Sequence, residues 1–243
     1  MFKKKSDPLV VAEHFVQQYF PHCLGAILAG SVVRGEGTST SDLDIVIFDE
    51  HILTSYRESL YLEGWPIEVF AHSLSSYKQF FELDCERAKP SLPKMVAEGV
   101  VLKGQGVLSP IQEEARVLLS NGPREWSKET ITMKRYFLTD VLDDFIGCTN
   151  TQEELFVVHS LLDLANEFVL RTNRQWTGTS KWGYRALKQF DESFAIKFTE
   201  AFDAYYKHRE KEKIVEIVDE MLQPYGGRLF EGFSLGKPTS DNY

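Results

Sequence analysis

The sequence predicts an α+β protein, with a small mixed β-sheet in its first part and an all-helical bundle in its second part. Two observations give this prediction. Short apolar or alternating runs separated by Gly, Ser and Pro fill residues 26–102, and beyond residue 104 apolar side chains recur at the i, i+3, i+4 spacing of amphipathic helices. A chain of 243 residues, 43% hydrophobic and 26% charged, is long enough for two domains. We place them at residues 1–108 and 109–243.

The first part of the chain contains signals for helices, strands and tight turns. Asp7 suits the N-cap and Pro8 the first position of an opening helix. A turn at residues 63–65 joins two extended runs into a hairpin, whereas Pro90 and Pro93 indicate a break. The predicted elements are a helix over 8–20, strands over 26–29 and 42–48, a hairpin over 52–62 and 66–72, a helix over 73–88 and a strand over 100–102.

The second part is helical throughout. Its segments share an apolar stripe that would face a common core, as in a bundle. The predicted helices cover residues 110–119, 127–146, 152–172, 181–190, 194–206 and 213–222, and residues 236–243 have the composition of a frayed tail.

The composition limits the partners that the protein binds. The formal net charge is −9, so the chain lacks the long-range positive field that gathers nucleic-acid phosphates, and a small cationic partner suits it better. Dispersed cysteines with no C-x-x-C pair predict free thiols, and no apolar run approaches the roughly 18 residues of a membrane span. We therefore expect a cytoplasmic protein without a membrane or nucleic-acid partner. The cysteines are Cys23, Cys85 and Cys148.

Two aspartates lie in the most informative segment of the sequence. Asp42 and Asp44 begin an alternating strand, so both side chains point to one face with Cα atoms roughly 6.5–7 Å apart. Leu43, Ile45 and Ile47 point to the opposite face, into the core, which fixes the register. Neighbouring carboxylates repel unless a cation neutralises them, and oxygen ligands with no His or Cys nearby suit Mg²⁺ or Mn²⁺. The pair therefore predicts a divalent metal site.

Glu68 lies on the second strand of the predicted hairpin, where Ile67 and Val69 take one face and Glu68 takes the other. If this strand lies beside the strand of Asp42, three carboxylates form a cage for two ions about 3.5–4 Å apart, an arrangement common in phosphoryl transfer. Service as a general base is the alternative role for Glu68.

The turn at Gly30-Ser31 predicts the other half of the site. Glycine lets the backbone approach a phosphate, and the backbone N–H groups and the serine hydroxyl donate hydrogen bonds to its oxygens. Arg34 is placed to hold the same phosphates. The turn ends one strand and the two aspartates begin the next, which brings a phosphate cradle and a metal site together.

These motifs resemble the nucleotidyltransferase superfamily, which includes DNA polymerase beta and the antibiotic adenylyltransferases. The resemblance covers residues 26–72, and a shorter one, over residues 173–182, is to the helical domain of aminoglycoside and lincosamide nucleotidyltransferases. It implies a catalytic domain at 1–108, an acceptor-binding domain at 109–243, and Mg²⁺-dependent transfer of a nucleoside monophosphate, with pyrophosphate leaving. The residues that carry the first resemblance are Gly30-Ser31, Arg34-Gly35, Ser41-Asp42-Leu43-Asp44 and Glu68.

The resemblance also implies substrates and further site residues. AMP from ATP is the first choice of transferred group, and the acceptor is a hydroxyl of a small molecule such as an aminoglycoside or lincosamide, with antibiotic resistance as the associated role. Ser41 joins the nucleotide-binding residues, and Lys181 would touch the triphosphate. Glu167 is the first choice of base for the acceptor hydroxyl, and Asp163, four residues earlier on the same helix face, is the alternative.

Two other functions remain open at this stage. The same chemistry could act on a protein or RNA acceptor, although the net charge of −9 disfavours RNA. A catalytically silent nucleotide-binding regulator is the third hypothesis, and the retained acidic residues argue against it. The sequence leaves the acceptor, the nucleotide, and the choice between monomer and homodimer undecided.

Overall fold

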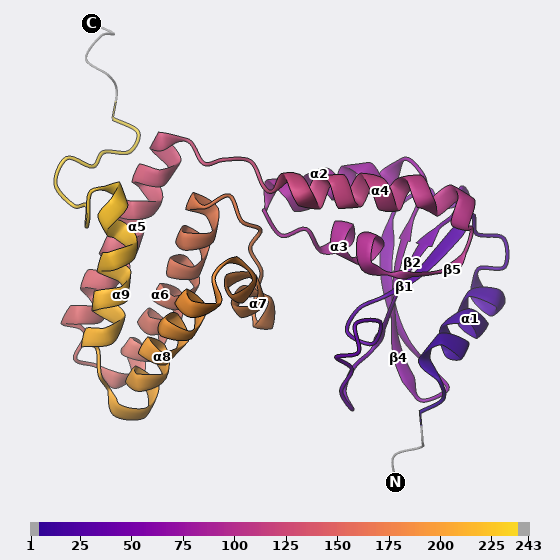
Figure 1. Cartoon of the computed structure of the whole chain (residues 1–243), viewed down its shortest axis with the longest axis horizontal. Coiled ribbons are helices and arrows are strands. Elements are labelled where there is room, and N and C mark those ends of the chain that lie inside the picture. The colour runs from indigo at the N-terminus through magenta and orange to yellow at the C-terminus, as the bar shows by residue number, and fades with distance from the viewer. Residues whose placement is uncertain (1–4, 238–243) are drawn as a thin grey trace, which may run out of the picture. The chain divides into compact units, whose positions relative to one another are not determined.

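The computed structural model describes residues 5–237, and the chain divides into two compact units, Met1–Gly122 and Pro123–Tyr243 (Figure 1). The first unit contains a β-sheet covered by helices, and the second is helical. The predicted α+β class is confirmed. No helix within residues 5–237 combines the length and the apolarity needed to cross a membrane.

The first unit is built on a mixed sheet, which has five strands within the described residues. Its order is β3-β4-β2-β1-β5, and β2 and β4 run parallel whereas the other neighbours are antiparallel. The chain therefore leaves β2, forms the outer strand β3 and returns as β4 beside β2. The strands are β1 (Gly25–Ala29), β2 (Leu43–Phe48), β3 (Tyr56–Leu62), β4 (Trp65–His72) and β5 (Val100–Lys103).

Helices cover both faces of this sheet (Figure 1). On one face α1 (Pro8–Tyr19) packs Val11 and Phe15 against the side chains of β2 and β4 that point that way. On the other face lie α2 (Ser76–Glu86), α3 (Ser91–Glu98) and α4 (Gln105–Asn121), which share a second core with Ile27, Val46 and Phe48. Because both faces are packed, the central strands cannot shift their register.

Two elements near the end of the first unit differ from the sequence prediction. Residues 91–98, which we expected to be a break, form α3, with Pro90 as its N-cap and Pro93 in its first turn. Prolines fit there because the first helical N–H groups have no partner within the helix. Helix α4 begins at Gln105 and contains Pro110, since Leu108, Ile111 and Ala115 are buried against the sheet.

The first compact unit ends at Gly122 and includes α4, whereas the sequence predicts a domain boundary after residue 108. Another difference is at the outer strand, which begins at Tyr56 and not at residue 52. Gly236 and Lys237 lie outside any helix or strand, and the remainder of the predicted tail, 238–243, is outside the described residues.

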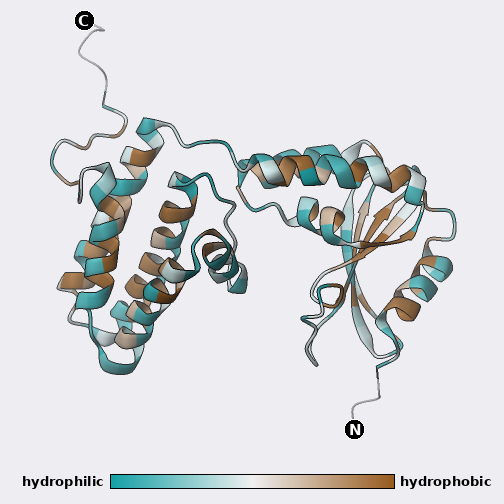
Figure 2. Ribbon diagram, in the orientation of Figure 1, coloured by the Kyte–Doolittle hydropathy of each residue, from teal (hydrophilic) through white to brown (hydrophobic). Residues whose placement is uncertain are grey.

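The second unit is a set of helices around one apolar core. Figure 2 shows hydrophobic stretches on facing sides of its helices and hydrophilic stretches on their outer sides. Phe145, Phe168 and Tyr205 are the largest side chains that are completely or almost completely buried in this core. The elements are α5 (Lys128–Gly147), α6 (Thr151–Thr172), α7 (Lys181–Phe190), α8 (Glu192–His208), α9 (Glu212–Leu222) and the 3₁₀ helix η1 (Gln223–Tyr225).

The N-cap of α1 gives a first test of the fold. The Asp7 carboxylate accepts hydrogen bonds from the backbone N–H groups of Leu9 and Val10, at 3.0 and 3.2 Å. We expect Asp7→Ala to lower the free energy of unfolding of the protein by about 1 kcal/mol, because these two N–H groups lose their acceptor. Asp7→Asn is the matched control and should retain nearly all of the stability. Urea unfolding monitored by circular dichroism measures both, and equal losses in the two variants would contradict the capping role.

Candidate functional site

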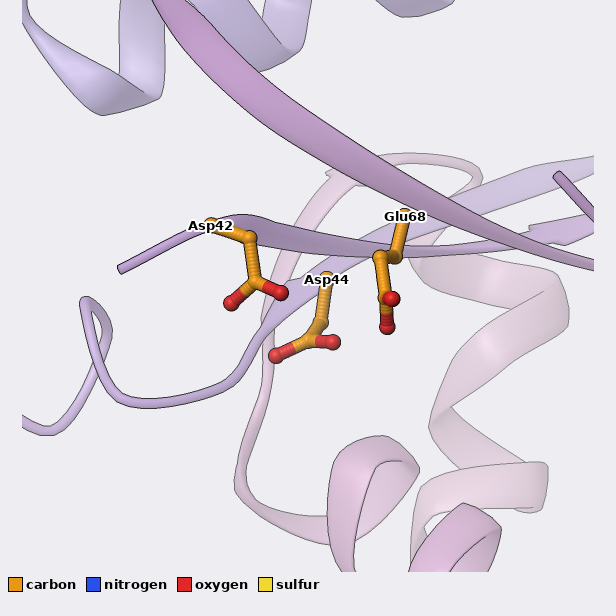
Figure 3. Close-up of side chains that lie close together, drawn as sticks. All are labelled: Asp42, Asp44 and Glu68. Carbon is orange, nitrogen blue, oxygen red and sulfur yellow. The ribbon is translucent and has the colours of Figure 1, made fainter. Parts of the chain in front are cut away.

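Three carboxylates converge on one side of the sheet. Asp42, Asp44 and Glu68 each place one carboxylate oxygen within 4.8 Å of the other two. Their side chains extend to the same side of the strands (Figure 3). Among residues 5–237 they form the one group of three or more His, Cys, Asp or Glu side chains close enough to hold a metal ion.

The backbone pairing explains this convergence. Asp44 on β2 is in register with Glu68 on β4, and the two strands are parallel, so their side chains stand next to each other on one face. Asp42 immediately precedes β2 and shares this face. The alternate residues Leu43, Ile45 and Ile67 are completely buried on the other face, which prevents the acids from turning inward.

Mutual repulsion and burial act most strongly on Asp44. Burial, followed by the charges of Asp42 and Glu68, raises the pKa of Asp44 from 3.8 to about 6, although the charges of Arg34 and Arg57 lower it. A site that makes a carboxylate hold its proton this firmly favours any cation that can take the proton's place. Three oxygen donors without His or Cys suit Mg²⁺ or Mn²⁺, so the residues fit the predicted metal.

Gly30 borders directly on this acidic group. Ala29 on β1 is in register with Asp44, and Gly30, the next residue, has a φ of +86°. A Cβ at this position would lie 2.0 Å from Asp44 Oδ2. Glycine is therefore required both by the left-handed backbone and by the space that the Asp44 carboxylate occupies.

The two predicted serines hold the loop between β1 and β2 together. Ser31 Oγ donates to Ser41 Oγ at 3.1 Å, and Ser41 Oγ accepts from the Thr38 N–H at 2.9 Å. At the same position, Lys5 Nζ donates to the Ser41 carbonyl at 3.0 Å. The loop thus closes on itself beside the first aspartate and brings both serine hydroxyls next to Gly30 and Asp42.

Arg34 lies in the same loop and is half-buried. Its guanidinium donates to Glu36 at 3.2 Å and to Glu98 on α3 at 3.4 Å. It is close enough to Asp44 for its charge to lower the pKa of that carboxyl. These contacts place a cation between the glycine-serine turn and helix α3.

Two cations near the site were not predicted from the sequence. Arg57 on β3 donates from Nη2 to Glu68 Oε2 at 2.5 Å. Lys94 on α3 has a lowered pKa, mainly because it is partly buried, with the Glu98 charge opposing and the Arg34 charge adding to this effect. Neither residue belongs to a motif. Lys94 could not be predicted because helix α3, on which it lies, was not expected. Arg57 could not be predicted because its contact with Glu68 depends on the pairing of β3 with β4.

The remaining predicted residues belong to the helical unit. Glu167 on α6 accepts a hydrogen bond from Lys134 Nζ on α5 at 2.6 Å. Asp163 is 67% exposed and lies 3.9 Å from His159 Nε2, one turn earlier on the same helix. Lys181 is the first residue of α7, and its side chain is exposed. The pairing with Lys134 fixes the Glu167 carboxylate in one place, whereas Asp163 is largely solvated.

Among solved structures, the chain is similar to that of a nucleotidyltransferase-like protein from Exiguobacterium sibiricum 255-15. The two share 10% sequence identity with a TM-score of 0.47, and the match covers 90% of this chain and 75% of that chain. No protein-family model and no curated protein sequence matches this chain. A structural similarity this low supports no inference about function. Any such inference has to rest on the chemistry of the three carboxylates.

The raised pKa of Asp44 predicts a pH-dependent effect of Asp44→Asn on stability without metal. Between about pH 4 and 6 Asp44 is more protonated in the folded wild type than in the unfolded chain, so its contribution to the free energy of unfolding falls as the pH rises through this range. Asparagine does not titrate and avoids this loss. We expect the variant to be more stable than the wild type by on the order of 2 kcal/mol at pH 8, and to have nearly equal stability at pH 4.

Urea unfolding in EDTA at the two pH values measures this difference. Glu58→Gln is the matched control, because Glu58 is an exposed acid on β3 outside the three-carboxylate group. An advantage of Asp44→Asn that is the same at pH 4 and pH 8 would show that Asp44 does not carry the repulsion.

Proposed function

We propose that this protein is a Mg²⁺-dependent nucleotidyltransferase that transfers a nucleoside monophosphate from a nucleoside triphosphate to a hydroxyl of a small molecule. One observation carries the proposal, namely the convergence of Asp42, Asp44 and Glu68 beside the turn at Gly30 and Ser31. Carboxylates alone suit many metal sites. A phosphate cradle on the adjoining turn is what makes a polyphosphate the fitting ligand.

Asp42, Asp44 and Glu68 are the proposed ligands of two Mg²⁺ ions. When bound, such ions neutralise the phosphate oxygens and stabilise the attacking and leaving oxygens of the displacement. The protein contributes rigid placement, since the register of β2 and β4 holds Asp44 next to Glu68 before any ligand arrives. This preorganisation avoids the free-energy cost of gathering three like charges during the reaction.

The loop between β1 and β2 is the proposed binding site for the triphosphate. Backbone N–H groups after Gly30 and the hydroxyls of Ser31 and Ser41 can donate to phosphate oxygens, and Arg34 supplies a positive charge from the same loop. In the reaction the acceptor oxygen forms a bond to the α-phosphorus. The bond from that phosphorus to the oxygen bridging to the β-phosphate breaks, and pyrophosphate leaves with the electron pair.

The proton of the acceptor hydroxyl requires a base, and Glu167 is the proposed one. Its carboxylate accepts a hydrogen bond from Lys134 Nζ at 2.6 Å, which orients it while its other oxygen can still accept a proton. We also propose that the helical unit binds the acceptor and that Lys181 contacts the triphosphate. A net charge of −9 favours a cationic acceptor such as an aminoglycoside. ATP is the proposed donor, as the family resemblance implies.

The metal ligands give the decisive test of the proposed reaction. We expect Asp42→Asn and Asp44→Asn each to lower turnover at least about 10³-fold, because the developing charge on the phosphates loses its stabilisation. Pyrophosphate release is measured with a panel of nucleoside triphosphates, Mg²⁺ and cationic or lincosamide-like acceptors, and EDTA should abolish it. Glu58→Gln should retain wild-type activity. Full activity in either aspartate variant would exclude this site as the catalytic centre.

A separate prediction concerns the base. Glu167→Gln should lower kcat by roughly 10²–10⁴-fold and leave the affinity for Mg²⁺-nucleotide unchanged, since only proton removal is lost. Asp163→Asn on the same helix is the comparison and should have nearly wild-type kcat. Steady-state kinetics over a range of pH separates the two, and a loss confined to Asp163→Asn would transfer the role to that residue.

A further inference from the structure

Arg57 contacts the three-carboxylate group and has no role in the proposed reaction. It lies on the outer strand β3 opposite Phe70, two residues before Ser59, which is the residue opposite Glu68. Its guanidinium lies over the Phe70 ring, 5.0 Å from the centroid, and Nη2 reaches back to Glu68 Oε2 at 2.5 Å. The aromatic ring thus supports the arginine on the same face of the sheet as the three carboxylates.

The position of this guanidinium matches that of a counter-ion. It forms an ion pair with Glu68, one carboxylate of the group, on the face of the sheet that Asp42 and Asp44 share. A positive charge so placed offsets part of the repulsion among the three acids when no metal is bound. It therefore stabilises the arrangement that Figure 3 shows.

The same geometry makes Arg57 a competitor of a metal ion. A carboxylate oxygen that accepts a hydrogen bond from a guanidinium is less available as a metal ligand, and the arginine charge repels a divalent cation nearby. The Arg57 side chain is 60% exposed, whereas that of Glu68 is 23% exposed. An ion pair with one largely solvated partner is weak, so the arginine can move into water while Glu68 stays in place.

We propose that Arg57 is the built-in counter-ion of Glu68 and that a divalent metal ion displaces it from this carboxylate on binding. This inference rests on the metal site of the proposed function. It makes Arg57 a positioning residue that holds Glu68 in place between turnovers and weakens metal binding. A site that retains its ions less tightly can release them together with pyrophosphate.

Binding of Mn²⁺ to the protein without nucleotide tests this role independently of activity. Free Mn²⁺ is measured by electron paramagnetic resonance for the wild type, Arg57→Met, Arg57→Lys and Arg116→Met. Methionine keeps an apolar stem over Phe70 but removes the charge, and lysine keeps the charge. Arg116 on α4 pairs with Glu113 and is the matched control for loss of one positive charge.

We expect Arg57→Met to bind Mn²⁺ roughly five- to tenfold more tightly than the wild type, because both the repulsion and the competition for Glu68 disappear. Arg57→Lys and Arg116→Met should remain within about twofold of the wild type. Thermal unfolding without metal should show a lower midpoint for Arg57→Met and a larger upward shift on adding Mn²⁺.

The outcomes separate the two proposals. Equal or weaker Mn²⁺ binding by Arg57→Met, with normal binding by the wild type, would overturn the counter-ion role and show that Arg57 orients Glu68 for the metal. Tighter binding by Arg57→Lys as well as by Arg57→Met would exclude charge as the cause and overturn it too. Absence of Mn²⁺ binding by the wild type would overturn the metal site itself, and with it the proposed function.

Discussion

Electrostatic repulsion among three carboxylates within 4.8 Å of one another is the constraint around which the first unit is organised. Unfolded chains avoid such repulsion by keeping like charges apart. Here the register between β2 and β4 enforces it, because the alternate residues of both strands are completely buried under α1. Burial of the apolar face thus supplies the free energy that holds the acids together. The core on one side of the sheet and the site on the other are consequences of the same alternation.

The surroundings of the acids reduce the repulsion without removing it. Gly30 leaves room for the Asp44 carboxylate, and Arg34 and Arg57 lower its pKa, yet that pKa is still raised to about 6. A fully neutralised site would have no remaining attraction for a divalent ion. A site with no cations would have stronger repulsion and would reduce further the usual stability margin of about 5–15 kcal/mol. The observed arrangement lies between these extremes, which is the state expected of a site that binds and releases a cation.

The alternation of apolar and acidic residues was enough to predict that Asp42 and Asp44 share a face and that Leu43 is buried. The place of Glu68 beside them depended on strand order, which periodicity does not encode, and the pairing of β2 with β4 supplied it. Helix α3 was missed because its prolines resemble breaks when their position in the first turn is unknown. Arg57 could not be found either, since its partner is eleven residues away along the chain and adjacent only across a strand pair.

The ion pair between Lys134 and Glu167 extends this reasoning to the second unit. Its residues lie on α5 and α6 and are 33 positions apart, so their contact, like that of Arg57 with Glu68, exists only in the folded chain. In each pair a glutamate with a proposed role in the reaction accepts a hydrogen bond from a cation on a neighbouring element. Such a pair orients the carboxylate before substrate binds. The two units would therefore orient these acids by the same physical means, although the proposed metal ion has to displace Arg57 from Glu68 whereas Lys134 can remain on Glu167 during proton transfer.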